Sequence, residues 1–326
     1  MRYDRAGWMF PIDGRAPQLV AKPSRAVSPS LPRAVLDRVY RRVLTFGSRN
    51  GPAAIDIARR GLAPSDIYFM ELSSVDRSIT MSHALVDEFG FETISRVPGF
   101  RSLCEPCGGT GKIEGERCEA CSGMGYHLPM FPHNHGRDDY AIFAEDENGM
   151  LFWGMTRTLP WEKDTGQPKY RMLSTSGDAF ASLSGTPKYH VAGRKYLPWR
   201  VWFTEGILKS AVAARHLHRR VIGLSGTNVD AASTRAVCDL LRFWGTSEAV
   251  IAFDADKNDV DSQGNLLHHG VLAGEKALAE ALAKVVPSVK LAVWSKAHGK
   301  GIDDLVTGPR LGSYRLEDYQ HDQFQA

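Results

Sequence analysis

Hydrophobic residues recur at intervals of three and four positions in the segment that follows residue 31. They fall on one face of a helix, and Pro32 is a favourable residue for its start. The positions concerned are Val35, Leu36, Val39, Tyr40, Val43 and Leu44. Two shorter helical patterns cover residues 53–60 and 82–89, and each precedes a glycine, which ends a helix without a steric penalty. The pattern therefore predicts three helices in this part of the chain.

Apolar runs typical of strands begin at residue 140. Residues 140–144 and 150–155 are separated by the turn-forming segment Glu147-Asn148-Gly149, which predicts a hairpin. From residue 201 onward, short apolar runs alternate with helical patterns at residues 207–219, 230–244 and 271–286. The runs are VWF, VIGLSG, AVIAFDAD and VKLAVW. This alternation predicts an α/β fold, with a parallel sheet that helices cover on both faces.

These changes of pattern divide the chain into four regions. Residues 1–30 mix Pro, Ser, Gly and isolated charges without a period, and we expect an N-terminal arm. Residues 31–198 are predicted to form a basic α+β subdomain, residues 199–310 the α/β domain, and residues 311–326 a C-terminal tail. The basic character comes from the arginines between positions 33 and 60. Charge alone favours a solvated helix surface there, with a phosphate-binding face as the alternative.

Composition and charge narrow the function classes. The chain has 326 residues, and its formal net charge of +3 is too small to imply nucleic-acid binding as a bulk effect. No segment approaches the roughly 18 uninterrupted apolar residues that a membrane helix needs. The first residues lack the pattern of a secretory signal. We therefore expect a cytoplasmic protein without a membrane partner.

Four of the five cysteines form two CxxC pairs. Cys104 and Cys107 make up the first pair, Cys118 and Cys121 the second, and ten residues separate the pairs. Each pair can occupy two corners of a tetrahedron, so that together they form a closed zinc shell without an open position. We predict one structural zinc ion, bound within a module that covers residues 101–127. The nearby histidines are expected to be loop residues, because four thiolates already satisfy the metal.

Both CxxC pairs continue with the same glycine pattern, so that CxxCxGxG occurs twice. The glycines are Gly109 and Gly111 in the first copy, and Gly123 and Gly125 in the second. The module resembles the cysteine-rich module of DnaJ-type chaperones. Nothing else in the chain resembles a J-domain, so the resemblance implies a zinc-binding module and not a co-chaperone.

Acidic residues follow several of the predicted strands. Asp254 and Asp256 end AVIAFDAD at a spacing that places both on one side of an extended strand. Ligand sites in parallel sheets lie beyond the carboxyl ends of the strands, and paired carboxylates there suit Mg²⁺, with Mn²⁺ as an alternative. Glu205 ends an earlier strand, and Gly206 after it allows a phosphate to approach backbone amides. Each feature alone also fits a solvated or capping acid.

The order of these motifs carries more information than any one of them. A strand-Glu-Gly-helix unit, then strand-Asp-x-Asp, then Gly-x-Asp-Asp resembles the Toprim pattern of primases, topoisomerases and related nucleases. The resemblance implies that Glu205 is an acid-base or metal-linked carboxylate and that Asp254 and Asp256 bind magnesium. It extends the magnesium ligands to Asp303 and Asp304.

The segments before this unit resemble the catalytic core of bacterial primases. The matching elements are Arg60-Gly61-Leu62, the predicted hairpin that leads to Gly154-Met155-Thr156-Arg157, and Pro168-Lys169-Tyr170-Arg171. The resemblance implies that Arg157, Lys169 and Arg171 contact template or nucleotide phosphates. Surface salt bridges are the alternative. Because a cysteine module is inserted within the core, the architecture resembles primase-like proteins of phages and other mobile elements more than it resembles replicative primases.

Together these patterns predict a magnesium-dependent nucleotidyltransferase that synthesises short primers. Its expected partners are a single-stranded DNA template and nucleoside triphosphates, and a replicative helicase is a further candidate. A Toprim nuclease is the first alternative, because the same carboxylates can support phosphodiester cleavage. A non-catalytic nucleic-acid-binding regulator of a mobile element is the second.

Overall fold

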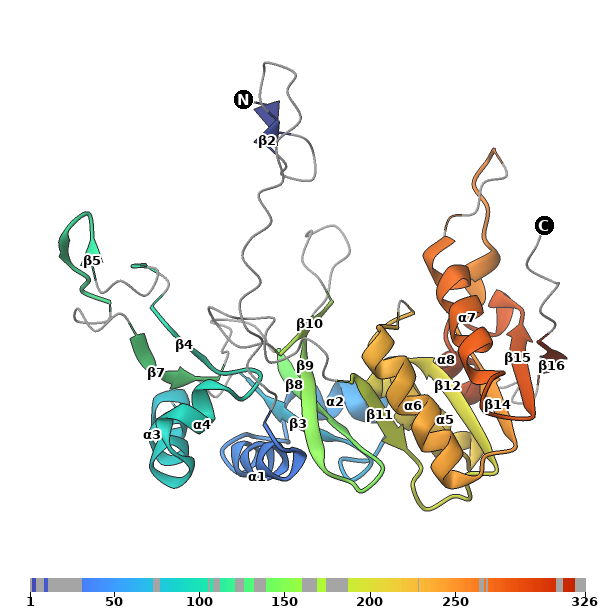
Figure 1. Ribbon diagram of the computed structural model, residues 1–326, viewed down its shortest axis with the longest axis horizontal. Helices are drawn as coiled ribbons and strands as arrows, with labels where there is room; N and C mark the ends of the chain where they lie inside the picture. Colours follow the sequence, from blue (N-terminus) through green and yellow to red (C-terminus); the bar gives the residue numbers. More distant parts are fainter. Residues whose placement is uncertain are drawn as a thin grey trace.

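The computed structural model describes residues 2–3, 9–10, 31–72, 77–104, 106–107, 112–120, 126–131, 139–159, 169–173, 187–227, 229–263, 267, 269–308 and 313–319. Two main sheets lie side by side, one in each half of the chain (Figure 1). A single cluster of buried apolar side chains runs through both halves. This mixed α/β architecture confirms the predicted fold class.

The first half is built on a four-stranded antiparallel sheet. Its order is β10-β9-β8-β3, formed by β3 (Tyr68–Glu71), β8 (Tyr140–Glu145), β9 (Leu151–Arg157) and β10 (Tyr170–Met172). Strands β8 and β9 form the predicted hairpin, with Ile142 opposite Met155. Both strands are almost wholly apolar because nearly all of their side chains are buried.

Helices cover this sheet where the apolar periodicity predicts them. Helix α1 (Arg33–Leu44) packs on β9 and buries one face, and α2 (Pro52–Arg59) follows it. Gly61 has a φ of +74°, which explains a glycine at this position. Helix α3 (Arg77–Phe89) begins earlier than predicted, and α4 (Phe91–Ser95) follows directly.

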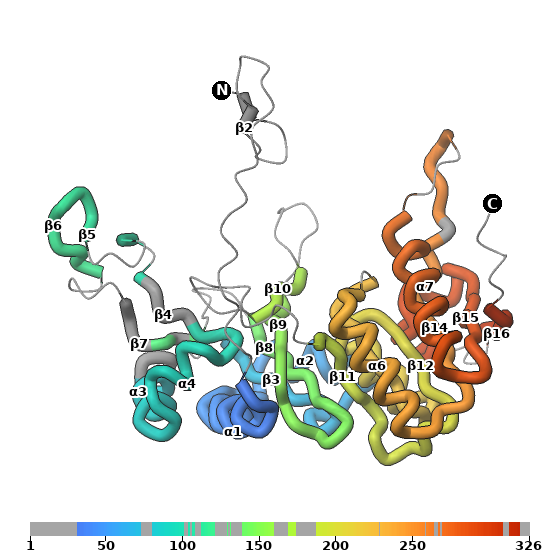
Figure 2. The backbone as a smooth tube through the Cα atoms, viewed as in Figure 1, coloured from blue at the N-terminus to red at the C-terminus, as the bar shows by residue number. Residues whose placement is uncertain are grey.

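Short strand pairs complete the first half. Strand β4 (Arg101–Leu103) pairs with β7 (Tyr126–Met130) and so brings together the two ends of the predicted zinc module. Within the module, β5 (Lys112–Ile113) and β6 (Glu116–Arg117) form a small hairpin that lies apart from both main sheets (Figure 2). Strands β1 (Arg2–Tyr3) and β2 (Met9–Phe10) form a further pair.

The second half contains a six-stranded sheet with the order β11-β13-β12-β14-β15-β16. Its four central strands are parallel, as predicted: β12 (Arg200–Glu205), β13 (Arg220–Leu224), β14 (Glu248–Ile251) and β15 (Ser288–Trp294). Two further strands, which the sequence patterns did not predict, extend this sheet at its two edges. Strands β11 (Tyr189–Ala192) and β16 (Tyr314–Asp318) pair with it antiparallel, and both lie outside residues 199–310.

Three connecting helices lie where the patterns predict them: α5 (Ile207–Leu217), α6 (Ala231–Trp244) and α7 (His269–Leu282). Helix α8 (Ile302–Thr307) and the short 3₁₀ turns η2 (Ala255–Asn258) and η3 (Lys296–His298) were not predicted. Asp230 caps α6 by accepting a hydrogen bond from the Ser233 amide at 2.8 Å. Helix α5 packs against β11, β13 and α8 and also contacts β8, so it lies between the two sheets.

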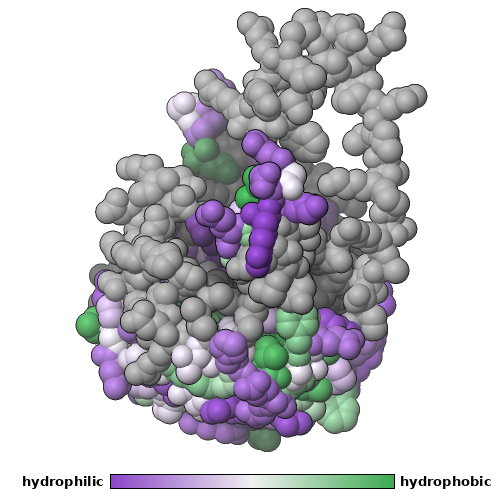
Figure 3. All heavy atoms as spheres, turned by 90° about the vertical axis from the view of Figure 1, so that its left-hand side faces the viewer, coloured by the Kyte–Doolittle hydropathy of each residue, from purple (hydrophilic) through white to green (hydrophobic). Residues whose placement is uncertain are grey.

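The surface of the first half is mixed in character. On the end of the molecule that Figure 3 faces, the described residues are largely hydrophilic, and apolar side chains form small separate areas. None of the helices in the described part of the chain combines the length and apolar character needed to cross a bilayer.

Candidate functional site

The predicted carboxylates lie at or near the carboxyl ends of the central parallel strands. Strands β12 and β14 are parallel neighbours, and Glu205 ends β12 while Asp254 follows β14. Asp256 lies in the adjoining turn η2, and Asp303 lies in the first turn of α8. The backbone amide of Ala255 donates to the carbonyl oxygen of Lys300 at 2.8 Å, which joins the two loops.

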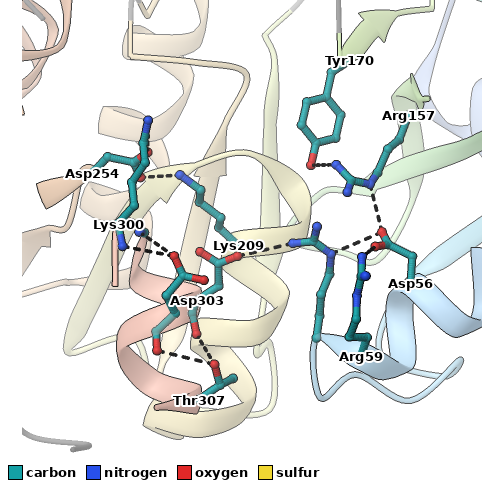
Figure 4. Close-up of polar contacts among 12 residues, drawn as sticks. Asp56, Arg59, Arg157, Tyr170, Lys209, Asp254, Lys300, Asp303 and Thr307 are labelled. Carbon is teal, nitrogen blue, oxygen red and sulfur yellow. Dashed lines mark hydrogen bonds and ion pairs between the residues drawn. The ribbon is translucent and has the colours of Figure 1, made fainter. Parts of the chain in front are cut away.

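Two lysines lie among these acids (Figure 4). The ammonium group of Lys209, from the first turn of α5, donates to Asp254 Oδ1. Lys300 Nζ lies 2.7 Å from Asp256 Oδ2 and 3.7 Å from Asp254 Oδ2. One ammonium group thus sits between the two aspartates in a position where a metal cation would be attracted.

Glu205 is partly exposed, but one of its carboxylate oxygens is buried. Its Oε1 atom is buried and accepts no hydrogen bond within the described ranges. Burial raises the pKa of Glu205, and the charge of nearby Asp254 adds to this, although Lys209 acts in the opposite direction. A buried carboxylate oxygen without a partner is costly, so this atom is suited to a ligand that supplies one.

The carboxylates of Asp303 and Asp304 have different surroundings. Burial raises the pKa of Asp303, and its Oδ2 atom lies 3.4 Å from the Arg60 guanidinium. Asp304 Oδ2 accepts hydrogen bonds from the backbone amides of Lys300 and Gly301, both at 3.1 Å. Asp304 therefore caps α8, which explains its presence without a metal.

Gly206 forms the turn between β12 and α5. Its φ is +81°, and its amide donates to the carbonyl oxygen of Leu224 at 2.6 Å. A Cβ atom at this position would meet no atom within 4 Å. The conformation of the turn, and not local crowding, explains the glycine.

A second polar cluster lies in the first half, around the buried carboxylate of Asp56. Asp56 Oδ2 accepts from Tyr140 Oη at 2.7 Å and from Arg157 Nε at 2.9 Å. Arg59 and Arg60 pair with the same carboxylate at 2.7 and 3.3 Å. Burial alone would raise the pKa of Asp56, but the Tyr140 hydrogen bond and the charges of Arg60 and Arg157 outweigh it and hold the pKa well below its ordinary value.

The predicted phosphate-binding residues are placed around this cluster. Arg157 is buried, and its second contact is the hydroxyl of Tyr170 at 2.8 Å (Figure 4). Lys169 is half-buried, and burial lowers its pKa, with the charges of Arg157 and Arg60 acting in the same direction. Arg171 is exposed on the edge strand β10. Lys169 and Arg171 thus remain candidates for phosphate contact, while Arg157 mainly holds the cluster together.

The cysteines form a compact group. The ligand atoms of Cys104, Cys107 and Cys118 lie within 4.8 Å of one another, and all three side chains are buried. Cys104 Sγ and Cys118 Sγ are 3.6 Å apart, close to the roughly 3.8 Å edge of a tetrahedron with zinc–sulfur bonds of about 2.3 Å. The group fits zinc. Cys121 and the four motif glycines lie outside the described residues.

Comparisons with known proteins bear on the fold. No family model matches the chain, and no curated protein matches it in sequence. The structure is similar to that of the Aquifex aeolicus primase (zinc-binding and RNA polymerase domains), with a TM-score of 0.55 at 14% identity. Its fold resembles that of a primase polymerase domain.

The alignment with that primase covers 88% of this chain and 63% of the A. aeolicus chain, so this chain spans less than two thirds of that structure. A second similar structure is the RNA polymerase domain of Mycobacterium tuberculosis primase DnaG in complex with a double-stranded DNA oligomer with a 6-nucleotide overhang. Its TM-score is 0.53 at 13% identity, over 87% of this chain and 79% of that one.

Within this primase-like fold, the sequence patterns did not identify Lys209, Lys300 or Asp56 as members of a polar site. Lys209 lies in the first turn of α5, and Glu205 ends strand β12 four positions earlier, so no helical spacing relates the two residues. The sequence places Arg59 and Arg60 three and four positions after Asp56, but no local signal indicates its contact with Arg157, which is 101 positions away.

Proposed function

We propose that the protein is a primase-like nucleotidyltransferase that synthesises short oligonucleotides on single-stranded DNA. One observation carries the proposal: a chain with the fold of a primase polymerase domain groups Glu205, Asp254 and Asp256 at the carboxyl edge of its parallel sheet. Open α/β sheets bind ligands at this edge. The level of sequence identity supports the fold, and the activity is our inference from the site.

Asp254 and Asp256 are proposed to hold Mg²⁺, or Mn²⁺ as an alternative, with Asp303 close by. A bound dication would neutralise charge on the triphosphate and on the reacting phosphoryl group. Lys300 is more than half exposed and can move away from the two aspartates. Glu205, whose pKa burial raises, is suited to accept a proton from the attacking hydroxyl.

The first half is proposed to hold the template and incoming nucleotide. The charges of Arg157, Lys209 and Asp303 act on Lys169, which places it near both clusters. Arg171 is exposed two positions further along the chain, and positive charge there would attract phosphates. Residues 31–198 and 199–310 are proposed as the two functional parts, with the arm and tail at residues 1–30 and 311–326. A replicative helicase and a mobile-element origin remain parts of this proposal.

The cysteine module is proposed to bind one structural zinc ion, with Cys121 as the fourth ligand. Three buried thiolates at tetrahedral spacing support it. A closed shell leaves no position for substrate, so the metal would stabilise residues 101–127 and not take part in chemistry.

A Toprim nuclease is the second candidate function, because an acid cluster beside a dication also supports phosphodiester cleavage. One experiment tests both. The zinc-loaded full chain is incubated with single-stranded DNA, labelled ribo- or deoxyribonucleotides and Mg²⁺ or Mn²⁺, and products are scored for synthesis and for cleavage.

We expect synthesis that falls at least about 100-fold in Asp254→Asn, Asp256→Asn and Glu205→Gln. Asp239→Asn is the matched control, because this exposed aspartate lies on helix α6 and pairs there with Arg242. Cleavage without synthesis, lost in the same variants, would establish the nuclease. Inert wild type and variants that bind DNA equally well would favour the non-catalytic regulator.

A further inference from the structure

Lys209 occupies an unusual position for a lysine in a metal-binding site. Its ammonium group contacts Asp254 directly, and the charges of Glu205 and Asp303 also act on it. Figure 4 shows it reaching from α5 into the space between Asp254 and Asp303. We propose that Lys209 is a built-in cation that takes the place of a second divalent metal ion, so that the carboxylates bind one dication.

The two oxygens of Asp254 have separate partners. Oδ1 is taken by Lys209, whereas Oδ2 faces Lys300, whose ammonium group it shares with Asp256. In two-metal sites the ions lie about 3.5–4 Å apart and share bridging ligands. Here Asp254 is the carboxylate that could bridge two ions, and one of its oxygens already contacts the ammonium group of Lys209. The other side, between Asp254 and Asp256, is where a single dication would bind.

The two lysines differ in how firmly they are held. The side chain of Lys300 is 58% exposed, and that of Lys209 is 24% exposed. A Cβ atom on Gly301 would lie 2.4 Å from Asp303 Oδ1 and 3.1 Å from Lys209 Cε, so the glycine makes room for both side chains. Withdrawal of Lys209 would leave the half-buried acids Glu205 and Asp303 without this neighbouring charge. Lys300 is therefore the cation that a metal displaces, and Lys209 stays.

The charges of the site agree with one dication. The site has four carboxylates and three cations. The carboxylates are Glu205, Asp254, Asp256 and Asp303, and the cations are Lys209, Lys300 and Arg60. Exchange of Lys300 for one dication leaves the group close to neutral before substrate binds. A second dication would add a large positive charge directly beside Lys209, which like-charge repulsion at short range opposes.

The inference rests on the proposed function in that it concerns the same carboxylates, but its test does not require activity. Mn²⁺ binding to the zinc-loaded full chain is measured by equilibrium dialysis and titration calorimetry, and pairs of ions are detected by spin coupling in electron paramagnetic resonance. We expect one Mn²⁺ per wild-type chain, no coupled pair, and loss of binding in Asp254→Asn.

Substitutions at the two lysines separate the proposal from a general charge effect. Lys209→Asp is expected to bind two coupled Mn²⁺ ions, while Lys209→Arg keeps one. Lys300→Met is the matched control, since it also removes one positive charge from beside Asp254; it should bind one ion at least about tenfold more tightly. Should Lys209→Asp fail to fold, Lys209→Met takes its place, and we expect tighter first binding and a second, weaker ion.

Two coupled ions in the wild type, or one ion in every folded Lys209 variant, would overturn the proposal. If instead the wild type binds one ion and makes no oligonucleotide, the proposed function fails and the built-in cation stands.

Discussion

The buried carboxylate of Asp56 offers a sharp test of how the first half is held together. Asp56→Asn keeps the shape of the side chain and removes its charge. The side chain is 3% exposed, and the guanidinium of Arg157 that it pairs with belongs to a side chain that is 5% exposed. The substitution therefore leaves a buried cation without its counter-charge, which is the costly way to break an ion pair.

The size of the effect follows from the donors around each oxygen. Oδ2 accepts from Tyr140, Arg157 and Arg60, whereas Oδ1 pairs with Arg59, whose side chain is 73% exposed. The carbonyl oxygen of an asparagine can take the Oδ2 position, and the exposed Arg59 can move away from the amide. We therefore expect a loss near the lower end of the usual range for a broken buried pair, about 3 kcal/mol.

Urea unfolding followed by circular dichroism measures this loss at pH 7. Arg59→Ala is the matched control, because it removes an exposed partner of the same carboxylate and should cost less than about 1 kcal/mol. The pKa of folded Asp56 lies below its ordinary value of 3.8, so its stabilising effect is full above that value and is lost as the pH falls below it. The gap between wild type and Asp56→Asn should thus persist from pH 7 to about 5 and shrink below about 4. A loss under about 1 kcal/mol at pH 7, equal to that of Arg59→Ala, would refute the reasoning.

Three further predictions concern other sites. Elemental analysis of protein purified without chelator should find one zinc per chain, and Cys104→Ser should lose both zinc and thermal stability; a zinc-free variant of unchanged stability would contradict the structural role. Burial lowers the pKa of His190 to about 3, against an ordinary value of 6.5, so the unfolded chain gains this proton first and stability should fall as the pH drops from about 6.5 towards 3. Unfolding titrations should show a shallower acid slope in His190→Gln, and an identical slope would exclude this group as the cause. Binding of single-stranded DNA should weaken with salt, with a slope reduced by about one in Lys169→Gln and in Arg171→Gln; unchanged slopes would return both residues to ordinary surface roles.

Local periodicity accounts for the parts of the fold that were predictable. The helix at residues 33–44 and the alternation of strands and helices after residue 200 depend on which side of an element is buried, and the spacing of apolar residues records this directly. The edge strands β11 and β16 were not predicted, because they lack a clear spacing of apolar residues. They are short, and β16 has charged and half-buried positions instead of a continuous apolar run.

The candidate site was predictable only in part. The carboxylates follow buried strands, so their common edge could be inferred from the order of the elements. The sequence did not separate the roles of Asp303 and Asp304, although Asp304 stands three positions after Gly301 as the acid of a helix cap does. The contact between Lys209 and Asp254 joins residues 45 positions apart, and the sheet register decides it.

Arg60 connects the two clusters and explains why they belong to one site. Its Nε atom lies 3.3 Å from Asp56 Oδ2, and its Nη1 atom lies 3.4 Å from Asp303 Oδ2. A planar guanidinium with donors on several edges can hold both carboxylates at once, which a lysine ammonium could do only as a point charge. Through this one side chain, the network that supports Arg157 and Tyr170 contacts the acids beside Lys209. Under the proposed function, a nucleic acid bound to the first half would thereby keep a defined position relative to the carboxyl ends of the parallel strands, as template-directed transfer of a nucleotide requires.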